Sequence, residues 1–134
     1  MIILTGASGG IGKGILEGLS KIDTVVGIHN RSLPGDTASG RVQYEKLNIE
    51  DTSSIKSFAE KWKGKLKRIT LIHGAVFNAD GLFASYKETD WDKMMNVNLK
   101  GNFFLTQALL PQMIREKWGR IIHISSVVGM QGRV

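Results

Sequence analysis

The chain has 134 residues and a net charge of +6, with 42% hydrophobic and 22% charged residues, as expected of a single globular domain. It contains no cysteine, which excludes disulfides, thiolate metal sites and a cysteine nucleophile. No apolar stretch reaches membrane-spanning length and the first residues lack the basic start of a signal peptide, so we expect a cytoplasmic protein without membrane contacts.

The first residues predict a strand, a glycine-rich turn and a helix. Residues 2–5 are an apolar run, and residues 11–20 carry apolar side chains on one helical face. Glycines between such elements let backbone N–H groups approach a pyrophosphate at the positive end of the helix. We therefore predict a dinucleotide-binding turn made by Gly6, Ser8, Gly9, Gly10, Ile11 and Gly12.

A phosphate-binding P-loop is the nearest alternative for this turn. It would need glycine at position 7 and serine or threonine after Lys13. The chain has Ala7 and Gly14 at these places, which disfavours a P-loop.

Further along the chain, strands and helices are predicted to alternate. Apolar and β-branched runs predict strands over residues 24–29, 42–48, 69–74 and 120–125, and helical periodicity predicts helices over 52–62 and 90–117. Thr52 or Ser53 and Asp90 are the expected N-caps. Pro111 should bend or break the last helix. The alternation indicates an α/β fold, a Rossmann-type doubly wound parallel sheet.

The end of the second strand carries Asn30, Arg31 and Ser32, with no acidic residue before Asp36. An acid there would bind the free ribose 2′-hydroxyl of NAD, whereas an arginine suits the 2′-phosphate of NADP. The sequence therefore favours NADP, with NAD as the alternative. An ordinary exposed loop arginine remains the other interpretation of Arg31.

Two further groups of residues raise the question of nucleic-acid binding and of metal binding. The cationic run Lys61, Lys63, Lys65, Lys67 and Arg68 has only Trp62 as an interleaved aromatic residue, so we interpret it as a solvated helix end and expect no nucleic-acid partner. Three histidines, His29, His73 and His123, lie near the carboxyl ends of predicted strands, but the first strand should separate His29 from His73. We therefore expect no metal site.

The glycine spacing after Thr5 resembles the cofactor turn of the short-chain dehydrogenase/reductase family. Residues 94–101 resemble the family's N-V-N-x-x-G helix, and residues 119–126 resemble its strand ending in the active-site serine. These motifs occur in the family's order along the whole chain. The resemblance implies an oxidoreductase that transfers hydride between NADP(H) and a small carbonyl or alcohol substrate.

The resemblance also implies roles for individual residues. It places the active-site asparagine at Asn98 and the active-site serine at Ser126. Asn48, where the family often has aspartate, would contact the adenine. The remaining implied cofactor contacts are Ile49, His73, Gly74, Ala75 and Ile124.

The family's Tyr-x-x-x-Lys is not found in this sequence. Tyr44 is followed four residues later by Asn48, and Tyr86 by Asp90. The resemblance therefore implies that residues 1–134 form the cofactor-binding domain, truncated after the fifth strand and inactive alone. The alternative is a non-catalytic nucleotide-binding fragment that acts only through association.

We also expect a homo-oligomer. The fifth strand is apolar on both faces, as in a central strand, and its truncated position leaves it at an edge of the sheet. Members of the family pair through the long helix, here around residues 103–110.

Overall fold

The computed structural model describes residues 1–32 and 40–132, so the turn expected at 33–36 lies outside the described residues. Five parallel strands form one sheet in the order β3-β2-β1-β4-β5. This confirms the Rossmann-type parallel α/β fold. The strands are β1 (Ile2–Thr5), β2 (Val25–His29), β3 (Val42–Lys46), β4 (Thr70–His73) and β5 (Arg120–His123).

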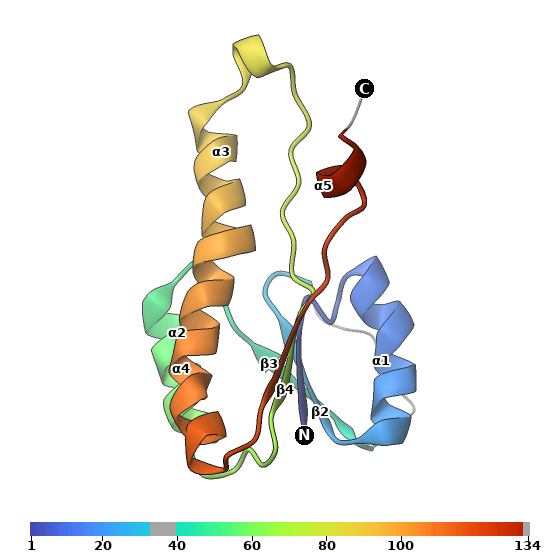
Figure 1. The fold of residues 1–134 in the computed structure, drawn as a ribbon, viewed down its shortest axis with the longest axis vertical. Coiled ribbons are helices and arrows are strands. Elements are labelled where there is room, and N and C mark those ends of the chain that lie inside the picture. Colours follow the sequence, from blue (N-terminus) through green and yellow to red (C-terminus); the bar gives the residue numbers. More distant parts are fainter. Residues whose placement is uncertain (33–39, 133–134) are drawn as a thin grey trace.

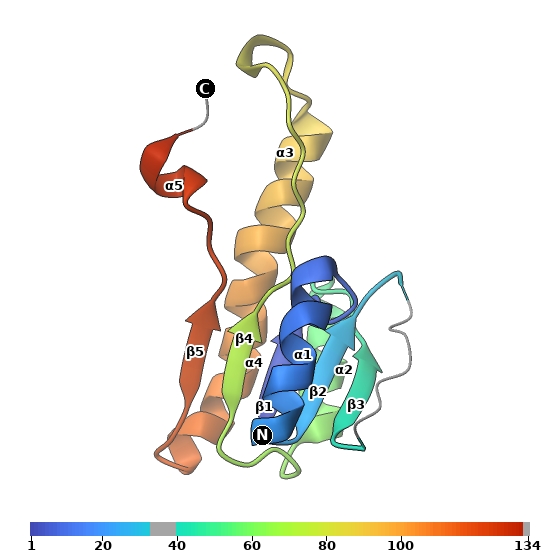
Figure 2. The same ribbon diagram turned by 90° about the vertical axis from the view of Figure 1, so that its right-hand side faces the viewer.

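Helices cover both faces of the sheet. Helix α1 (Gly10–Ile22) lies on one face, and α2 (Thr52–Trp62) and α4 (Asn102–Arg115) lie on the other (Figures 1 and 2). Side chains of a strand alternate between faces, so Ile3 packs toward α2 and α4 while Leu4 packs toward α1. The two cores fix the sheet between the helices and align the carboxyl ends of the strands.

The helix expected over residues 90–117 is not one regular helix. It consists of α3 (Glu88–Met95), the π-helical turn η2 (Asn96–Gly101) and α4. The chain does not break at Pro111, which lies inside α4. The irregularity falls instead at η2, where the Asn102 amide donates to the backbone carbonyl of Asn98 over 2.9 Å.

The helix caps differ from the predicted ones. Helix α2 is capped by Asp51, whose carboxylate accepts the Ser53 N–H over 2.9 Å, rather than by Thr52 or Ser53. Helix α3 begins before Asp90, with Lys87 at the N-cap position and no side-chain cap bond. The acceptor for the first turn of α2 is thus the Asp51 carboxylate, one residue before the predicted Thr52.

Three of the expected strands end earlier than predicted. Strands β3, β4 and β5 stop at Lys46, His73 and His123, so the polar residues that follow lie in loops at the carboxyl edge. Two short elements were not predicted: the 3-10 turn η1 (Phe83–Ser85) and α5 (Val128–Gln131).

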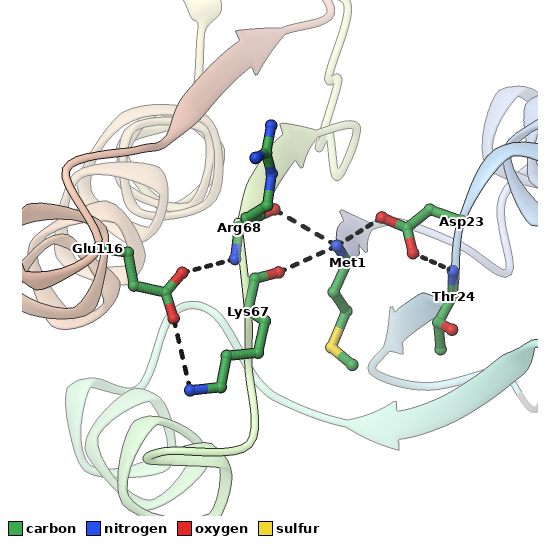
Figure 3. Close-up of polar contacts among 6 residues, drawn as sticks. All are labelled: Met1, Asp23, Thr24, Lys67, Arg68 and Glu116. Atoms are coloured by element: carbon green, nitrogen blue, oxygen red, sulfur yellow. Dashed lines mark hydrogen bonds and ion pairs between the residues drawn. The ribbon is translucent and has the colours of Figure 1, made fainter.

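A polar network fixes the opposite, amino edge of the sheet (Figure 3). The Met1 amino group lies 2.6 Å from the Asp23 carboxylate and donates to the carbonyl of Lys67 over 3.1 Å. The Glu116 carboxylate accepts the backbone N–H of Arg68, a residue with a φ of 46°. These bonds join the starts of β1, β2 and β4 to the end of α4. The hydrogen bond from the amino group lowers the pKa of Asp23.

Several residues of the cationic run have partners within the chain. Lys61 pairs with Glu45 at 2.7 Å, Lys63 with Glu60 at 3.3 Å, and the Arg68 guanidinium stacks 4.8 Å from the Trp118 ring centroid. These contacts are internal to the fold. Within the described ranges, none of the helices is both long and apolar enough to cross a bilayer.

Candidate cofactor site

A cavity of about 300 Å³ opens at the carboxyl edge of the sheet. Loops after β1, β2, β3 and β4 form its walls, together with α3 and η2. Ten of the predicted cofactor contacts line it, along with five residues that were not predicted. The lining residues are Gly6, Ser8, Gly9, Asn30, Arg31, Ser32, Asn48, Ile49, Glu50, Gly74, Ala75, Val76, Phe77, Lys93 and Val97.

The turn after β1 depends on glycine at two positions. Gly6 has a φ of +73°, and a Cβ there would lie 2.6 Å from the carbonyl oxygen of Gly74. A Cβ on Gly12 would collide with the carbonyl oxygen of Gly6. The first glycine lets the chain turn against β4, and the second lets α1 pack closely on the turn.

The amino end of α1 is open to an anion. The helix begins at Gly10 with Gly9 as N-cap, without a side-chain cap bond and without an acidic residue in its first turn. Its first N–H groups and positive dipole end therefore have no competing carboxylate. Gly10, Ile11 and Gly12 belong to this first turn and are not among the lining residues of the cavity.

Thr5 connects the turn after β1 with the turn after β4. Its buried hydroxyl accepts the backbone N–H groups of Gly74 and Ala75, each over 3.0 Å. This role of Thr5 was not predicted from the sequence, where Thr5 was only part of the glycine motif. The two bonds hold the Gly74–Ala75 wall of the cavity against the glycine turn.

The loops after β2 and β3 are joined at the other end of the cavity. The Asn30 amide donates to Oδ1 of Asn48 over 3.3 Å, and the backbone N–H of Glu50 donates to the same oxygen over 3.2 Å. Arg31 and Ser32 follow Asn30 and are exposed. Arg31 and Lys93 bring positive charge to the lining, and Glu50 brings negative charge.

His73 is a core residue rather than a wall of this cavity. Its side chain is 2% exposed, Nε2 lies 3.0 Å from Oγ1 of Thr106, and its ring stacks on that of His123 with centroids 4.6 Å apart. Burial, and then the charge of His123, lower the pKa of His73 to about 4. The imidazole is thus neutral at pH 7.

The three histidines do not converge. His29 ends β2, and β1 separates it from His73 and His123 in the sheet. In the described part of the chain, no three histidine, aspartate or glutamate side chains come together as metal ligands.

Asn98 and Ser126 occupy different surroundings. The Asn98 amide bonds both backbone groups of Phe77: Oδ1 accepts its N–H and Nδ2 donates to its carbonyl, each over 2.8 Å. Ser126 is exposed after β5, and its Oγ accepts the Val128 N–H over 3.2 Å. No hydrogen bond joins Asn98 to Ser126 in the described structure. Ile124, which follows β5, is also outside the lining of the cavity.

Five lining residues were missed: Glu50, Val76, Phe77, Lys93 and Val97. Lys93 and Val97 are four residues apart on one helical face, which is a signal that the sequence contained. The Lys93 ammonium lies 4.6 Å from the Phe77 ring centroid. Phe77 offered no comparable signal, because its place depends on the bonds from Asn98.

Both tyrosines make contacts within the fold. Tyr44 packs on the α1 side of the sheet, with its ring centroid 6.5 Å from that of His29. The Tyr86 hydroxyl donates to the carbonyl of Ala79 over 2.8 Å. Neither lines the cavity.

A glycine turn, an uncapped helix end and a parallel sheet of this order define a nucleotide-binding domain of the Rossmann type. The family model for short chain dehydrogenases matches residues 1–134, and the chain belongs to this family. It is 37% identical to the 3-oxoacyl-[acyl-carrier-protein] reductase FabG of Thermotoga maritima and 35% identical to nodulation protein G of a Rhizobium species. Each match covers 97% of this chain and 56% of the relative.

Solved structures show the same fold. A short chain dehydrogenase from Leptospira borgpetersenii with bound NAD⁺ matches 99% of this chain with a TM-score of 0.90 at 24% identity. The protein ElxO with NADP bound matches 98% with a TM-score of 0.87 at 27% identity. The chain covers 54% and 57% of these two structures. It therefore spans about half the length of the relatives it matches.

Proposed function

We propose that the chain is the cofactor-binding part of an NADP-dependent oxidoreductase that moves hydride between NADP(H) and a carbonyl or alcohol substrate. The observation that carries the proposal is the cavity that joins the glycine turn to Arg31. The relatives named as 3-oxoacyl-[acyl-carrier-protein] reductases support carbonyl reduction as the reaction class.

The residues around the cavity suit the pyrophosphate and the 2′-phosphate of NADP. The uncapped end of α1 offers backbone donors for the pyrophosphate. Arg31 and Ser32, at the end of β2, offer a guanidinium fork and a hydroxyl for a 2′-phosphate. The base would then lie beyond the ribose, against Asn48, Ile49 and Val97, where a polar edge meets apolar side chains.

When bound, the nicotinamide would supply or accept the hydride. The chain's own contribution is to bind and orient it. Thr5 holds the turn after β4, and Asn98 holds the backbone of Phe77. Ser126 offers an exposed hydroxyl that can donate to a substrate oxygen, where negative charge develops during carbonyl reduction.

Titration of NADP⁺ and NAD⁺ against the wild type and Arg31→Ala tests the cofactor assignment. Loss of a bidentate phosphate partner should weaken NADP⁺ binding by about 1–3 kcal/mol, roughly 5- to 150-fold, and leave NAD⁺ binding nearly unchanged. Arg115→Ala, an exposed arginine at the end of α4, is the matched control. Equal wild-type affinity for both cofactors would overturn the assignment to NADP.

The second candidate is a nucleotide-binding fragment that acts only through association. The contacts of Tyr44 and Tyr86 within the fold favour this second candidate for the 134-residue chain, because neither tyrosine is placed to protonate a substrate at the cavity.

General acid catalysis by a positioned side chain raises a reaction rate by about 10²–10⁴-fold. Assays of NADPH oxidation with ketones should therefore give no turnover with this chain. Steady consumption abolished by Ser126→Ala would identify a working enzyme.

A further inference from the structure

A second cavity lies away from the cofactor site. The segment after β4 and the start of α3 project beyond the carboxyl edge of the sheet (Figures 1 and 2), and a cavity of about 370 Å³ opens among residues 79–94. This volume falls within the range of small-molecule sites. Among the described residues, the two cavities share no lining residue, so the proposed function gives this second cavity no role.

Aromatic side chains from neighbouring elements line this cavity, which we call the aromatic cavity. Phe83 belongs to η1, and Tyr86 is the residue that follows this turn. Helix α3 contributes Trp91 and, three residues later on the same helical face, Met94. Phe83 is 100% exposed and Trp91 is 56% exposed, so both rings are accessible to a ligand.

The Tyr86 ring has a fixed place in the loop. Its hydroxyl donates to the carbonyl of Ala79 over 2.8 Å. A Cβ on Gly81 would lie 3.1 Å from the ring, which is a tight contact. The loop therefore packs closely around Tyr86, and this part of the aromatic cavity is formed before any ligand arrives.

The charge of the lining is negative. Asp80 lines the aromatic cavity, whose described lining has no lysine, arginine or histidine. Oδ1 of Asp80 accepts the Asn78 amide over 3.4 Å, and this bond leaves the charge of the carboxylate in place. The face of an aromatic ring also carries partial negative charge. Rings and carboxylate together therefore attract a cation and disfavour an anion.

We propose that the aromatic cavity binds a small organic cation with a quaternary ammonium head group, of the kind that choline carries. Such a head group has no N–H to donate, so it binds by packing its methyl groups against ring faces while its charge interacts with the rings and with Asp80. A neutral molecule of the same shape gains only the burial of its apolar surface.

The test is a titration with choline chloride at constant ionic strength, followed by NMR at the indole N–H signals. The chain has three tryptophans, Trp62, Trp91 and Trp118, and Trp91 is the one that lines the aromatic cavity. We expect a saturable shift of the Trp91 signal, which Trp91→Phe assigns. The neutral isostere 3,3-dimethylbutan-1-ol should bind about fivefold more weakly, or weaker still.

Three variants separate charge from shape. Asp80→Asn keeps the shape and removes the charge, so the preference for choline over the isostere should fall by about threefold. Asp92→Asn makes the same change at an exposed residue of α3 outside the lining and should leave the preference unchanged. Trp91→Leu, followed at the Met94 methyl signal, should weaken choline more than the isostere. Thermal melts establish that each variant folds.

Four results would overturn the inference. The first is a Trp91 signal that does not shift with choline, and the second is equal affinity for choline and its isostere. The third is an equal loss of preference in folded Asp80→Asn and Asp92→Asn, because long-range charge would then explain the binding. The fourth is an affinity for choline that falls as the protein concentration rises, because a second copy of the chain would then cover the cavity.

Discussion

Two glycines at the start of α1 differ in the space around them. The Gly6 carbonyl oxygen occupies the place of a Cβ on Gly12, whereas nothing lies within 4 Å of a Cβ on Gly10. We expect Gly12→Ala to lower the free energy of unfolding by about 1–3 kcal/mol, because the turn and α1 must separate. Gly10→Ala should leave stability unchanged or raise it by up to about 1 kcal/mol.

Urea unfolding measures both effects, and Gly14→Ala, another open position on α1, is the control for helix propensity. If Gly10→Ala folds normally but binds NADP⁺ weakly, the pyrophosphate approaches the backbone at Gly10. Equal stabilities of the Gly12 and Gly10 variants would contradict the packing argument.

His73 should make stability depend on pH. Its pKa is about 4 in the folded chain against 6.5 for the unperturbed group, so the unfolded state binds more protons between these values. The free energy of unfolding should therefore fall as the pH drops from 6.5 toward 4, by at most about 1.4 kcal/mol per pH unit. Urea unfolding at pH 7, 6, 5 and 4.5 measures this slope.

His73→Gln is the comparison that isolates this histidine. The variant should show a flatter pH profile than the wild type over the same range. Asp23 and the other carboxyl groups titrate in both proteins and drop out of the difference. If the pH profiles of the wild type and His73→Gln superimpose, folding does not lower the pKa of His73.

At the scale of elements, the sequence predicted the order of strands and helices because apolar periodicity reports burial. Residues 2–5 and 69–74 stand out as buried strands. The spacing of Ile11, Ile15 and Leu19 marks α1, although its buried apolar residue is Leu16 and Ile11 is 62% exposed. Local patterns did not predict η2, since the π-helical turn coincides with bonds from Asn98 and Asn102 to backbone atoms.

The candidate site was predictable where loops follow strands and poorly predictable elsewhere. Arg31 and Asn48 follow β2 and β3 directly, so their place at the carboxyl edge follows from the parallel sheet. Phe77 and Lys93 line a part of the cavity that forms where the segment after β4 packs against η2. Contacts between segments so far apart in the chain leave no local pattern in the sequence. Strands β3 and β5 were predicted too long because the apolar residues Leu47 and Ile124 continue past the last paired positions.

The bond pair between Asn98 and Phe77 should couple η2 to the cavity wall. Asn98→Ala removes the acceptor of the Phe77 N–H and the donor to its carbonyl, at a cost of about 1–3 kcal/mol. We expect faster amide hydrogen exchange at Phe77 and weaker NADP⁺ binding.

Asn96→Ala is the control, because Asn96 lies in the same turn and its side chain makes none of the described hydrogen bonds. The two variants should differ in exchange at Phe77. Unchanged exchange in Asn98→Ala would show that the segment after β4 is held by other contacts.

For the whole molecule, large apolar side chains remain exposed on β5 and on α4. Ile122 of β5 is 45% exposed and Phe103 of α4 is 60% exposed, and β5 is an edge strand with unpaired backbone groups. We expect concentration-dependent self-association, measured by light scattering, and we expect Ile122→Lys to weaken it.

Ile22→Lys is the matched control, because Ile22 is 76% exposed at the end of α1, outside both β5 and α4. It should leave the apparent mass of the assembly unchanged. A clean monomer at high protein concentration would contradict the prediction of a homo-oligomer.

The central place of β1 in the sheet has a consequence for folding during synthesis. Ile2 pairs with Val25 on one side and with Thr70 on the other. At about 5–20 residues per second, a ribosome needs roughly 3–14 s to go from Ile2 to Thr70. During that interval β1 can join β2 while its other edge stays open to foreign strands. The strand that is best protected in the finished sheet is thus exposed longest while the chain is being made.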